Sequence, residues 1–397
     1  MIKHLFKYLL IVLLAGGFTA CSEDEGAQIL GGLYEKVDIA PEPGMNLVGR
    51  VTDGKNPIEG AVVSDGFTVT TTDAQGVYQM RVKKSTPFVF VSVPADCEIP
   101  VENGMPKIYK KIALGDNDVV QRSFTLERTG KKERFTLLAL ADVQIGRDNE
   151  VVMLEKEVLP LLVPYVQQLD KPVYGISLGD LVWDNMPFHS VYKEQIRKIG
   201  VPVFQVIGNH DHDRNKYTDR EATENYRNHF GPTYYAFDMG RTHYIVLDDI
   251  VYHGAKKYDE QIDSLQLAWA AEYARRLPAG SRVCVAMHAP AMKAWKGNQV
   301  MESAARLMDA FAEGLGDYDK THKVLILTTQ VTYEGSDVGI YEVGKRVKNR
   351  FRFLEAHDMT IEAVVTKIMW LLAQDCDSFD QLQQRFYRQV NFDTFYH

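Results

Sequence analysis

The chain has 397 residues, of which 45% are hydrophobic and 25% are charged, a composition typical of a globular protein with two or three domains. The formal net charge is −8 and the sequence has no long basic run, which excludes the bulk electrostatic signature of a nucleic-acid-binding protein. We therefore expect no nucleic-acid-binding surface.

The N-terminus predicts an export signal. Lys3 and Lys7 precede an apolar run over residues 9–14, and small residues lead up to Cys21. Such a run is too short for a membrane-spanning helix and is typical of a signal peptide. The stretch FTAC, residues 18–21, resembles a bacterial lipobox, which implies cleavage before Cys21 and a lipid on its thiol. Plain secretion is the alternative.

A tether is expected to follow the signal peptide of residues 1–21. The acidic stretch SEDE, residues 22–25, resembles the surface-export tag of some Gram-negative lipoproteins, with a solvated linker as the alternative. Residues 22–44 have mixed composition and are interpreted as the tether. Together these features predict a lipid-anchored protein of the cell envelope, at the outer membrane or surface of a Gram-negative bacterium, whose membrane contact is the lipid on Cys21.

Residues 45–127 predict a small all-β sandwich domain. Short alternating runs are separated by Asp-Gly and Gly turns at close spacing, and FVFVSV, residues 88–93, is a further strand. The segment resembles carboxypeptidase-regulatory-like or transthyretin-like β-sandwich domains. That resemblance implies a structural spacer, with a substrate- or glycan-binding accessory as the alternative.

From Phe135 onward, apolar strand-like runs alternate with amphipathic helical segments, which predicts an α/β domain. Four runs each end in side chains that can bind a metal. These side chains are Asp142 with Gln144, Asp180, Asn209 with His210, and His288. Ligand sites of open α/β sheets lie at such strand ends.

Carboxylate, amide and imidazole groups in this pattern favour divalent metal chemistry. Two ions about 3.5–4 Å apart can clamp the attacking and leaving oxygens of a phosphoryl displacement. An aspartate can bridge the ions, and a nearby histidine can protonate the leaving oxygen. The donor set suits Mn, Fe or Zn better than Ca.

The motif series resembles calcineurin-like metallophosphoesterases. Its members here are Asp142-x-Gln144, Gly179-Asp180-x-x-x-Asp184-Asn185, Gly208-Asn209-His210-Asp211 and His288-x-Pro290. The resemblance implies a layered β-sandwich flanked by helices over residues 128–323, and a phosphate-ester substrate.

Residue roles carry over from this resemblance by motif. Asp142 and Gln144 would hold a first metal, Asp180 would bridge both, and Asn209 and His288 would hold a second. Gln144 stands where the family more often has histidine, which weakens the first site.

The resemblance to calcineurin-like metallophosphoesterases also implies a catalytic pair, whereas each residue taken alone has a simpler structural interpretation. His210 would face the substrate as proton donor or charge stabiliser, and Asp211 would orient it. Taken singly, an aspartate could be a helix N-cap, Asn209 a turn residue and His288 a core histidine. The remaining histidines and Asp213 are interpreted as surface or packing residues (His189, His212, Asp213, His229, His243). Asp248 and Asp249 are interpreted as a turn, with groups that support the metal ligands as the alternative.

The family's final Gly-His-x-His motif is missing. The strand-like run at 322–335 carries Thr328-Thr329-Gln330 at that place. Each metal would keep three protein ligands, so the resemblance implies two ions, or one if only one site survives. Residues 324–397 resemble the C-terminal part of bacterial type I L-asparaginases, and an amphipathic helix is expected at 359–372. The resemblance implies that recombination or a joining error replaced the last part of the phosphoesterase domain. A divergent native tail is the alternative.

These observations predict a metal-dependent phosphoesterase that acts through metal-activated water at a dinuclear site and is impaired by the missing motif. The alternatives are a non-catalytic envelope lipoprotein with a degenerate metal site and, more remotely, an amidohydrolase fusion. Against the last, the chain lacks a Thr-Gly-Gly-Thr-like nucleophile loop.

Overall fold

The computed structural model describes residues 35–115, 118–130, 134–240, 242–277 and 282–290, together with shorter segments between 292 and 388. The expected signal peptide, Cys21 and most of the tether lie outside the described residues. Residues 35–44 do belong to them, and they pack against the first domain. The backbone N–H groups of Asp38 and Ile39 donate to Oε1 of Gln121, and Arg50 pairs with Asp38 at 2.8 Å.

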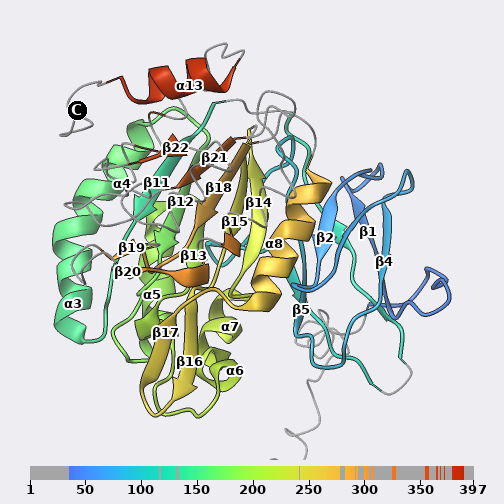
Figure 1. The fold of residues 1–397 in the computed structure, drawn as a ribbon, viewed down its shortest axis with the longest axis horizontal. Coiled ribbons are helices and arrows are strands. Elements are labelled where there is room, and N and C mark those ends of the chain that lie inside the picture. Colours follow the sequence, from blue (N-terminus) through green and yellow to red (C-terminus); the bar gives the residue numbers. More distant parts are fainter. Residues whose placement is uncertain are drawn as a thin grey trace, which may run out of the picture.

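The first domain is the expected all-β sandwich (Figure 1). Leu47, Tyr78 and Phe90 are buried in one core. Burial alternates along Val77–Met80, as the period-two pattern predicts, whereas all of Phe88–Val91 is buried. One sheet contains β1 (Leu47–Thr52), β4 (Val77–Met80), β9 (Val120–Gln121) and β10 (Phe124–Thr125). The other contains β2 (Val62–Ser64), β3 (Val69–Thr71), β5 (Phe88–Val91) and β8 (Tyr109–Lys111), and β6 (Val101–Glu102) forms a hairpin with β7 (Met105–Pro106).

The second domain contains two layered sheets with helices outside them, as the sequence predicts. Its first sheet has the parallel order β11-β12-β13, formed by β11 (Thr136–Leu140), β12 (Val173–Leu178) and β13 (Val203–Val206). Tyr174, Ile176 and Leu178 of β12 face the core between the sheets, and Val173 faces the core under the helices. The covering helical segments are α3 (Asp148–Met153), the π-helical turn Leu154–Val158, α4 (Leu159–Gln168), α5 (Phe188–Ile196), the 3₁₀ turn Arg197–Ile199, α6 (Asp219–Ala222) and α7 (Glu224–Phe230).

The second sheet packs against the first through aromatic rings. Phe204 of β13 stacks on Phe237 at 3.5 Å between ring centroids, and Phe237 stacks on Tyr244 at 5.0 Å. The strand order is β14-β15-β18-β21-β22, with only the β14–β15 pair antiparallel. These strands are β14 (Tyr235–Met239), β15 (Thr242–Val246), β18 (Arg282–Ala286), β21 (Val324–Leu327) and β22 (Leu354–Glu355), and two hairpins lie beside them, β16 (Ile250–Gly254) with β17 (Lys257–Glu260) and β19 (Met292–Lys293) with β20 (Gln299–Val300).

The helix α8 (Ser264–Arg276) joins the two domains, lying between the second sheet and the β-sandwich in Figure 1. Trp269 is 1% exposed; its ring contacts Phe90 at 6.0 Å between centroids, and its Nε1 donates to Oγ of Ser64 at 2.9 Å. Tyr273 hydrogen-bonds to Ser92 at 2.9 Å. The first domain therefore shares one hydrophobic core with the second, which is a closer association than that of a spacer.

The C-terminal region continues the second sheet where it is described. β22 pairs in parallel with β21, and α13 (Phe379–Phe386) buries Phe379, Leu382 and Phe386. Of the helix expected at 359–372, only Val364, Lys367 and Leu371 are described, and all three are helical and buried. The stretch Thr328-Thr329-Gln330 lies outside the described residues.

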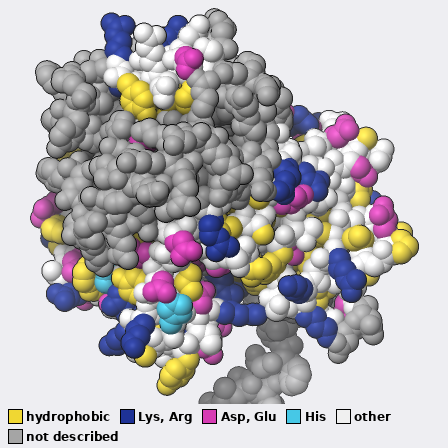
Figure 2. Space-filling model, viewed as in Figure 1, with side chains coloured by type: hydrophobic (Ala, Val, Ile, Leu, Met, Phe, Trp, Pro, Cys, Tyr) yellow, Lys and Arg dark blue, Asp and Glu magenta, His cyan; other side chains and the backbone are white. Residues whose placement is uncertain are grey.

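On the face shown in Figure 2, basic and acidic side chains of the described residues are interspersed rather than separated by sign. None of the described helices combines the length and the apolar character needed to cross a membrane.

Candidate metal centre

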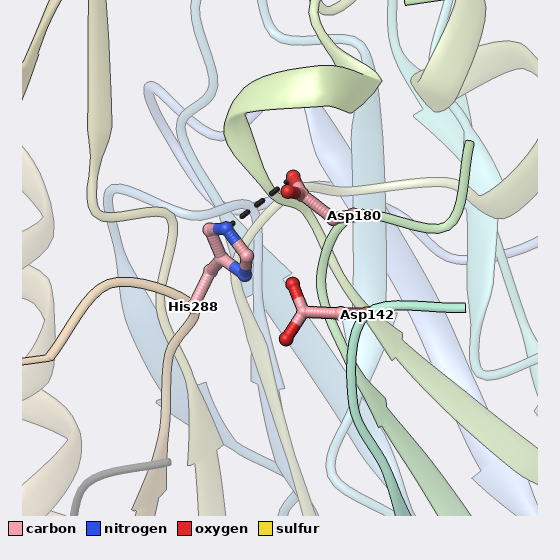
Figure 3. Close-up of side chains that lie close together, drawn as sticks. All are labelled: Asp142, Asp180 and His288. Carbon is pink, nitrogen blue, oxygen red and sulfur yellow. Dashed lines mark ion pairs between the residues drawn. The ribbon is translucent and has the colours of Figure 1, made fainter. Parts of the chain in front are cut away.

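The strand ends converge as expected for a ligand site of an α/β fold. Asp142 follows β11, Asp180 follows β12, and His288 follows β18 of the opposite sheet. One ligand atom from each of these three side chains lies within 4.8 Å of the others, and the side chains point toward one another in Figure 3. Asn209, after β13, joins them because its Oδ1 lies 3.2 Å from Nε2 of His288.

The backbone at this site is held in an uncommon conformation. Asp142, Gln144, Asp180 and Asp184 all have positive φ, between 48° and 53°. Non-glycine residues adopt this left-handed region at a cost of about 1–3 kcal/mol each, and such residues gather at functional sites. The conformation turns each chain sharply after its strand and directs the side chains into the gap between the strand ends.

His288 is fixed in one orientation. Its Nδ1 donates to the carbonyl of Leu178 at 2.9 Å, and its Nε2 lies 3.3 Å from Oδ1 of Asp180. Metal-binding histidines are held in this way, because a hydrogen bond from one ring nitrogen leaves the lone pair of the other directed at the metal. Asp249 supports His288 from behind, where its Oδ1 accepts the His288 backbone N–H at 3.2 Å.

Asp180 is the centre of the cluster. It is 3% exposed, and its Oδ1 accepts the backbone N–H of His210 at 2.9 Å. Its Oδ2 lies 3.0 Å from Nε2 of Gln144, so rotation of that amide by 180° would bring the Gln144 oxygen to the same place. Gly208 allows the close approach, since a Cβ on it would lie 2.3 Å from Oδ1 of Asp180.

The charges of the cluster explain its titration. Burial alone would raise the pKa of Asp180, but its hydrogen bond to His288 and the charge of that ring hold the pKa below its usual value. Burial would likewise lower the pKa of His288, but Asp180, with a smaller contribution from Asp249, raises it to about 9. Desolvation raises the pKa of Asp142, and the nearby Asp180 adds to the rise.

The structure corrects the expected orienting role of Asp211. Its carboxylate is fully buried and accepts the backbone N–H groups of Leu181 at 3.0 Å, Val182 at 3.1 Å and Gly208 at 2.8 Å. It also pairs with Nε2 of His189 at 3.1 Å. Asp211 therefore ties together the loops that follow β12 and β13, because these amides belong to both loops.

The side chain that orients His210 is Asp184. Nδ1 of His210 lies 2.9 Å from Oδ1 of Asp184, which also pairs with Nε of Arg214 at 2.8 Å. Nε2 of His210 lies 3.9 Å from Oδ2 of Asp180, so the ring borders the cluster. The indole of Trp183 stacks on the His210 ring at 4.1 Å between centroids.

Sequence reasoning missed several of these residues. Asp248 and Asp249 are buried, and Asp249 supports His288, which is the alternative to the turn that the sequence favours; Oδ2 of Asp249 has no hydrogen-bond partner in the described structure. Burial raises the pKa of Asp249 to about 7. His189 and His212 are fully buried, in keeping with a packing role. The signals in the sequence were the apolar strand before Asp248 and the motif position of Asp184, since Arg214 and Trp183 are not fixed positions of any motif.

The donor set fits divalent metal ions. Carboxylate oxygens, an amide oxygen and an imidazole nitrogen converge from four chain segments, and this mixture suits Mn, Fe or Zn. The hydrogen bond from His288 to Leu178 presents the correct ring nitrogen. Fold and site together define an α/β domain with a candidate site for divalent metal ions at its strand ends.

Two known protein families match parts of the chain. Residues 135–311 match the family described as calcineurin-like phosphoesterase, and residues 45–129 match the family described as the N-terminal domain of calcineurin-like phosphoesterase. The two matches assign residues 45–129 and 135–311 to the N-terminal and catalytic domains of calcineurin-like phosphoesterases. The assignment places it among hydrolases that act on phosphoric ester bonds and use divalent metal ions.

Individual relatives share less with the chain. L-asparaginase of Thermococcus kodakarensis is 38% identical over 65 residues, which cover 16% of this chain and 20% of that protein, and the similarity falls in the C-terminal part. A purple acid phosphatase from yellow lupin (Lupinus luteus) seeds aligns in structure at 11% identity and a TM-score of 0.33, over 70% of this chain and 62% of that one. The thermostable L-asparaginase structure from T. kodakarensis aligns at 14% identity and a TM-score of 0.25, over 66% and 100%.

Proposed function

We propose that the protein hydrolyses a phosphate ester with water activated at a dinuclear metal site. Asp142, Gln144 and Asp180 would hold one ion, and Asp180, Asn209 and His288 the other. The observation that carries the proposal is the convergence of Asp142, Asp180 and His288 to within 4.8 Å. Bound there, the ions supply Lewis-acid activation of water and neutralise the charge of the phosphoryl group.

His210 would serve as the proton donor. Hydrolysis forms a bond from the water oxygen to phosphorus and breaks the bond to the leaving oxygen, which must gain a proton. Nδ1 of His210 is held by Asp184 at 2.9 Å, and Nε2 faces the cluster, 3.9 Å from Asp180. The imidazole is therefore positioned to donate from Nε2 to the leaving oxygen.

We propose that metal affinity is lower than in a complete site. The sequence after β21 (Val324–Leu327) has no histidine where the family's last motif would supply one ligand per metal. Three protein ligands with water can still hold an ion, but each lost ligand weakens binding. The missing histidines are the observation that supports a second candidate function, a non-catalytic envelope protein with a degenerate metal site.

Metal-dependent turnover separates these two candidates. The purified chain is assayed with Mn²⁺ and an aryl phosphate monoester and diester, beside Asp180→Asn and the control Asp170→Asn, which alters an exposed carboxylate. We expect turnover that requires Mn²⁺, is lost in Asp180→Asn and is retained in Asp170→Asn. Equal rates in all three proteins, with or without Mn²⁺, would contradict the phosphoesterase proposal and support the non-catalytic candidate.

An amidohydrolase activity is not expected from the C-terminal similarity. The matched segment spans 20% of the asparaginase, and the activity of that enzyme belongs to the whole protein. Asparagine hydrolysis by the purified chain would overturn this view.

We propose further that the protein is lipid-anchored at Cys21 in the cell envelope, with its substrate outside the cytoplasm. The support is the sequence pattern of residues 1–25. Cys21→Ser is expected to release the protein from membranes on cell fractionation, and unchanged membrane association of this variant would refute the anchor.

A further inference from the structure

We propose that Trp183 is a stacking platform that selects phosphate esters whose leaving group carries a flat ring, such as an aryl group or a nucleobase. The inference rests on the proposed phosphoesterase function and names its substrate class. The indole lies beside the reacting groups, stacked on His210 at 4.1 Å between centroids and 19° between planes.

The indole extends from the buried cluster to solvent. Trp183 is 49% exposed, whereas the side chains of His210 and Asp180 are 14% and 4% exposed. The imidazole covers one face of the indole, and the 49% exposure of Trp183 leaves the remaining surface accessible to a ligand. A phosphate held at the cluster would place its leaving group beside His210, and therefore near this exposed surface.

The platform is held firmly by its backbone. The N–H of Trp183 donates to the carbonyl of Ile145 at 3.2 Å, and Nδ2 of Asn185 donates to the carbonyl of Gly146 at 2.8 Å. The chain approaches Gly146 closely, since a Cβ there would lie 3.0 Å from the Trp183 carbonyl oxygen. An exposed aromatic ring without such support would lose more freedom on binding and would contribute less affinity.

Stacking on an aromatic ring is selective for flat, polarisable groups. Aromatic pairs contribute beyond the burial of their area, and nucleobases bind tryptophan through their π-faces whatever their hydrogen-bonding edges. A linear alkyl phosphate has no such face. The site should therefore discriminate by leaving-group shape, with about a tenfold difference in KM supplied by Trp183.

The alternative role for Trp183 is to position His210 alone. In that case its removal would slow the chemical step equally for every substrate, because His210 acts on all leaving oxygens. A ring platform instead changes KM selectively. The ratio of KM values between substrates thus separates the two roles without reference to absolute activity.

The kinetic test compares phenyl phosphate, adenosine 5′-monophosphate and glycerol 3-phosphate in wild type, Trp183→Ala, Trp183→Phe and the control Tyr165→Ala. Tyr165 is a 58% exposed aromatic residue on α4. We expect Trp183→Ala to raise KM for the two ring-bearing substrates about tenfold relative to glycerol 3-phosphate. Trp183→Phe should restore most of the preference, and Tyr165→Ala should match wild type. An equal fall in kcat for all three substrates, with unchanged KM ratios, would overturn the platform.

Binding is measured separately, so that failure of catalysis does not decide the question. Adenosine 5′-monophosphate and ribose 5-phosphate are titrated calorimetrically into wild type and Trp183→Ala. Tighter binding of the nucleotide that is lost in Trp183→Ala supports the platform even where wild type shows no turnover. Equal affinity for the nucleotide and the sugar phosphate in wild type would refute it, whatever the outcome of the activity assay.

Discussion

Replacing Asp211 with alanine is expected to lower the stability of the whole catalytic domain rather than only to slow the chemistry. The carboxylate accepts three buried backbone N–H groups, those of Leu181, Val182 and Gly208. Each buried donor left without an acceptor costs roughly 1–3 kcal/mol. The loss should therefore reach at least about 3 kcal/mol, which lowers the unfolding midpoint by roughly 6–12 °C in a domain of this size.

The assay is thermal unfolding followed by circular dichroism in the presence of a chelator, so that loss of a bound metal cannot mimic the effect. Asp213→Ala is the matched control, because among the described residues the Asp213 carboxylate accepts only from Asn215, and the residue is partly exposed. Its free energy of unfolding should stay within about 1 kcal/mol of wild type. Equal midpoints for wild type and Asp211→Ala, with activity lost, would refute the reasoning and restore the catalytic role that sequence resemblance implies for Asp211.

Three further predictions concern the metal centre and the domain junction. Because the pKa of His288 is about 9 in the metal-free protein, metal must displace a proton at neutral pH, so Mn²⁺ affinity measured by calorimetry should rise with pH, by about tenfold per unit from this group. Gly208→Ala should reduce Mn²⁺ affinity at least about tenfold, since the new Cβ would displace Asp180 from a 2.3 Å approach. Trp269→Ala should lower the free energy of unfolding by about 3–5 kcal/mol and destabilise both domains together, because the ring and its hydrogen bond to Ser64 lie in their shared core.

Each of these predictions has a contrary result. A Mn²⁺ affinity that is constant between pH 6 and pH 8 would show that no ligand proton is displaced. Wild-type affinity in Gly208→Ala would mean that Asp180 does not need its observed position. Limited proteolysis can monitor the unfolding of each domain. If the first domain of Trp269→Ala unfolds at the wild-type midpoint, the two domains are independent.

The convergence of the strand ends could be predicted because it depends on topology. Parallel strands place their carboxyl ends on one edge, so Asp142, Asp180 and Asn209 had to lie near one another once their runs were recognised as strands. His288 belongs to the opposite sheet, so the strand pattern alone does not place it at the metal site. Its prediction as a ligand also depended on the order of the motifs along the chain. The left-handed backbone at Asp142 and Asp180 leaves no trace in the sequence, since aspartate also occupies ordinary turns.

The directions of neighbouring side chains could not be predicted. Asn209, His210 and Asp211 form one 3₁₀ turn, and each points to a different environment. Two of the partners of Asp211 are the backbone amides of Leu181 and Val182, 30 and 29 residues away in sequence, and no side-chain pattern reveals such contacts. The position of Trp183 over His210 depends likewise on a loop conformation that is set by contacts with residues 145–146.

The most direct test of the central claim is calorimetric titration of Mn²⁺ into the purified chain, beside Asp180→Asn and Asp170→Asn. A metal centre built on Asp180 predicts saturable binding in wild type and Asp170→Asn, with affinity in Asp180→Asn lower by at least about 100-fold. Equal binding in all three proteins, or no saturable binding in any of them, would contradict the assignment of this cluster as a metal centre.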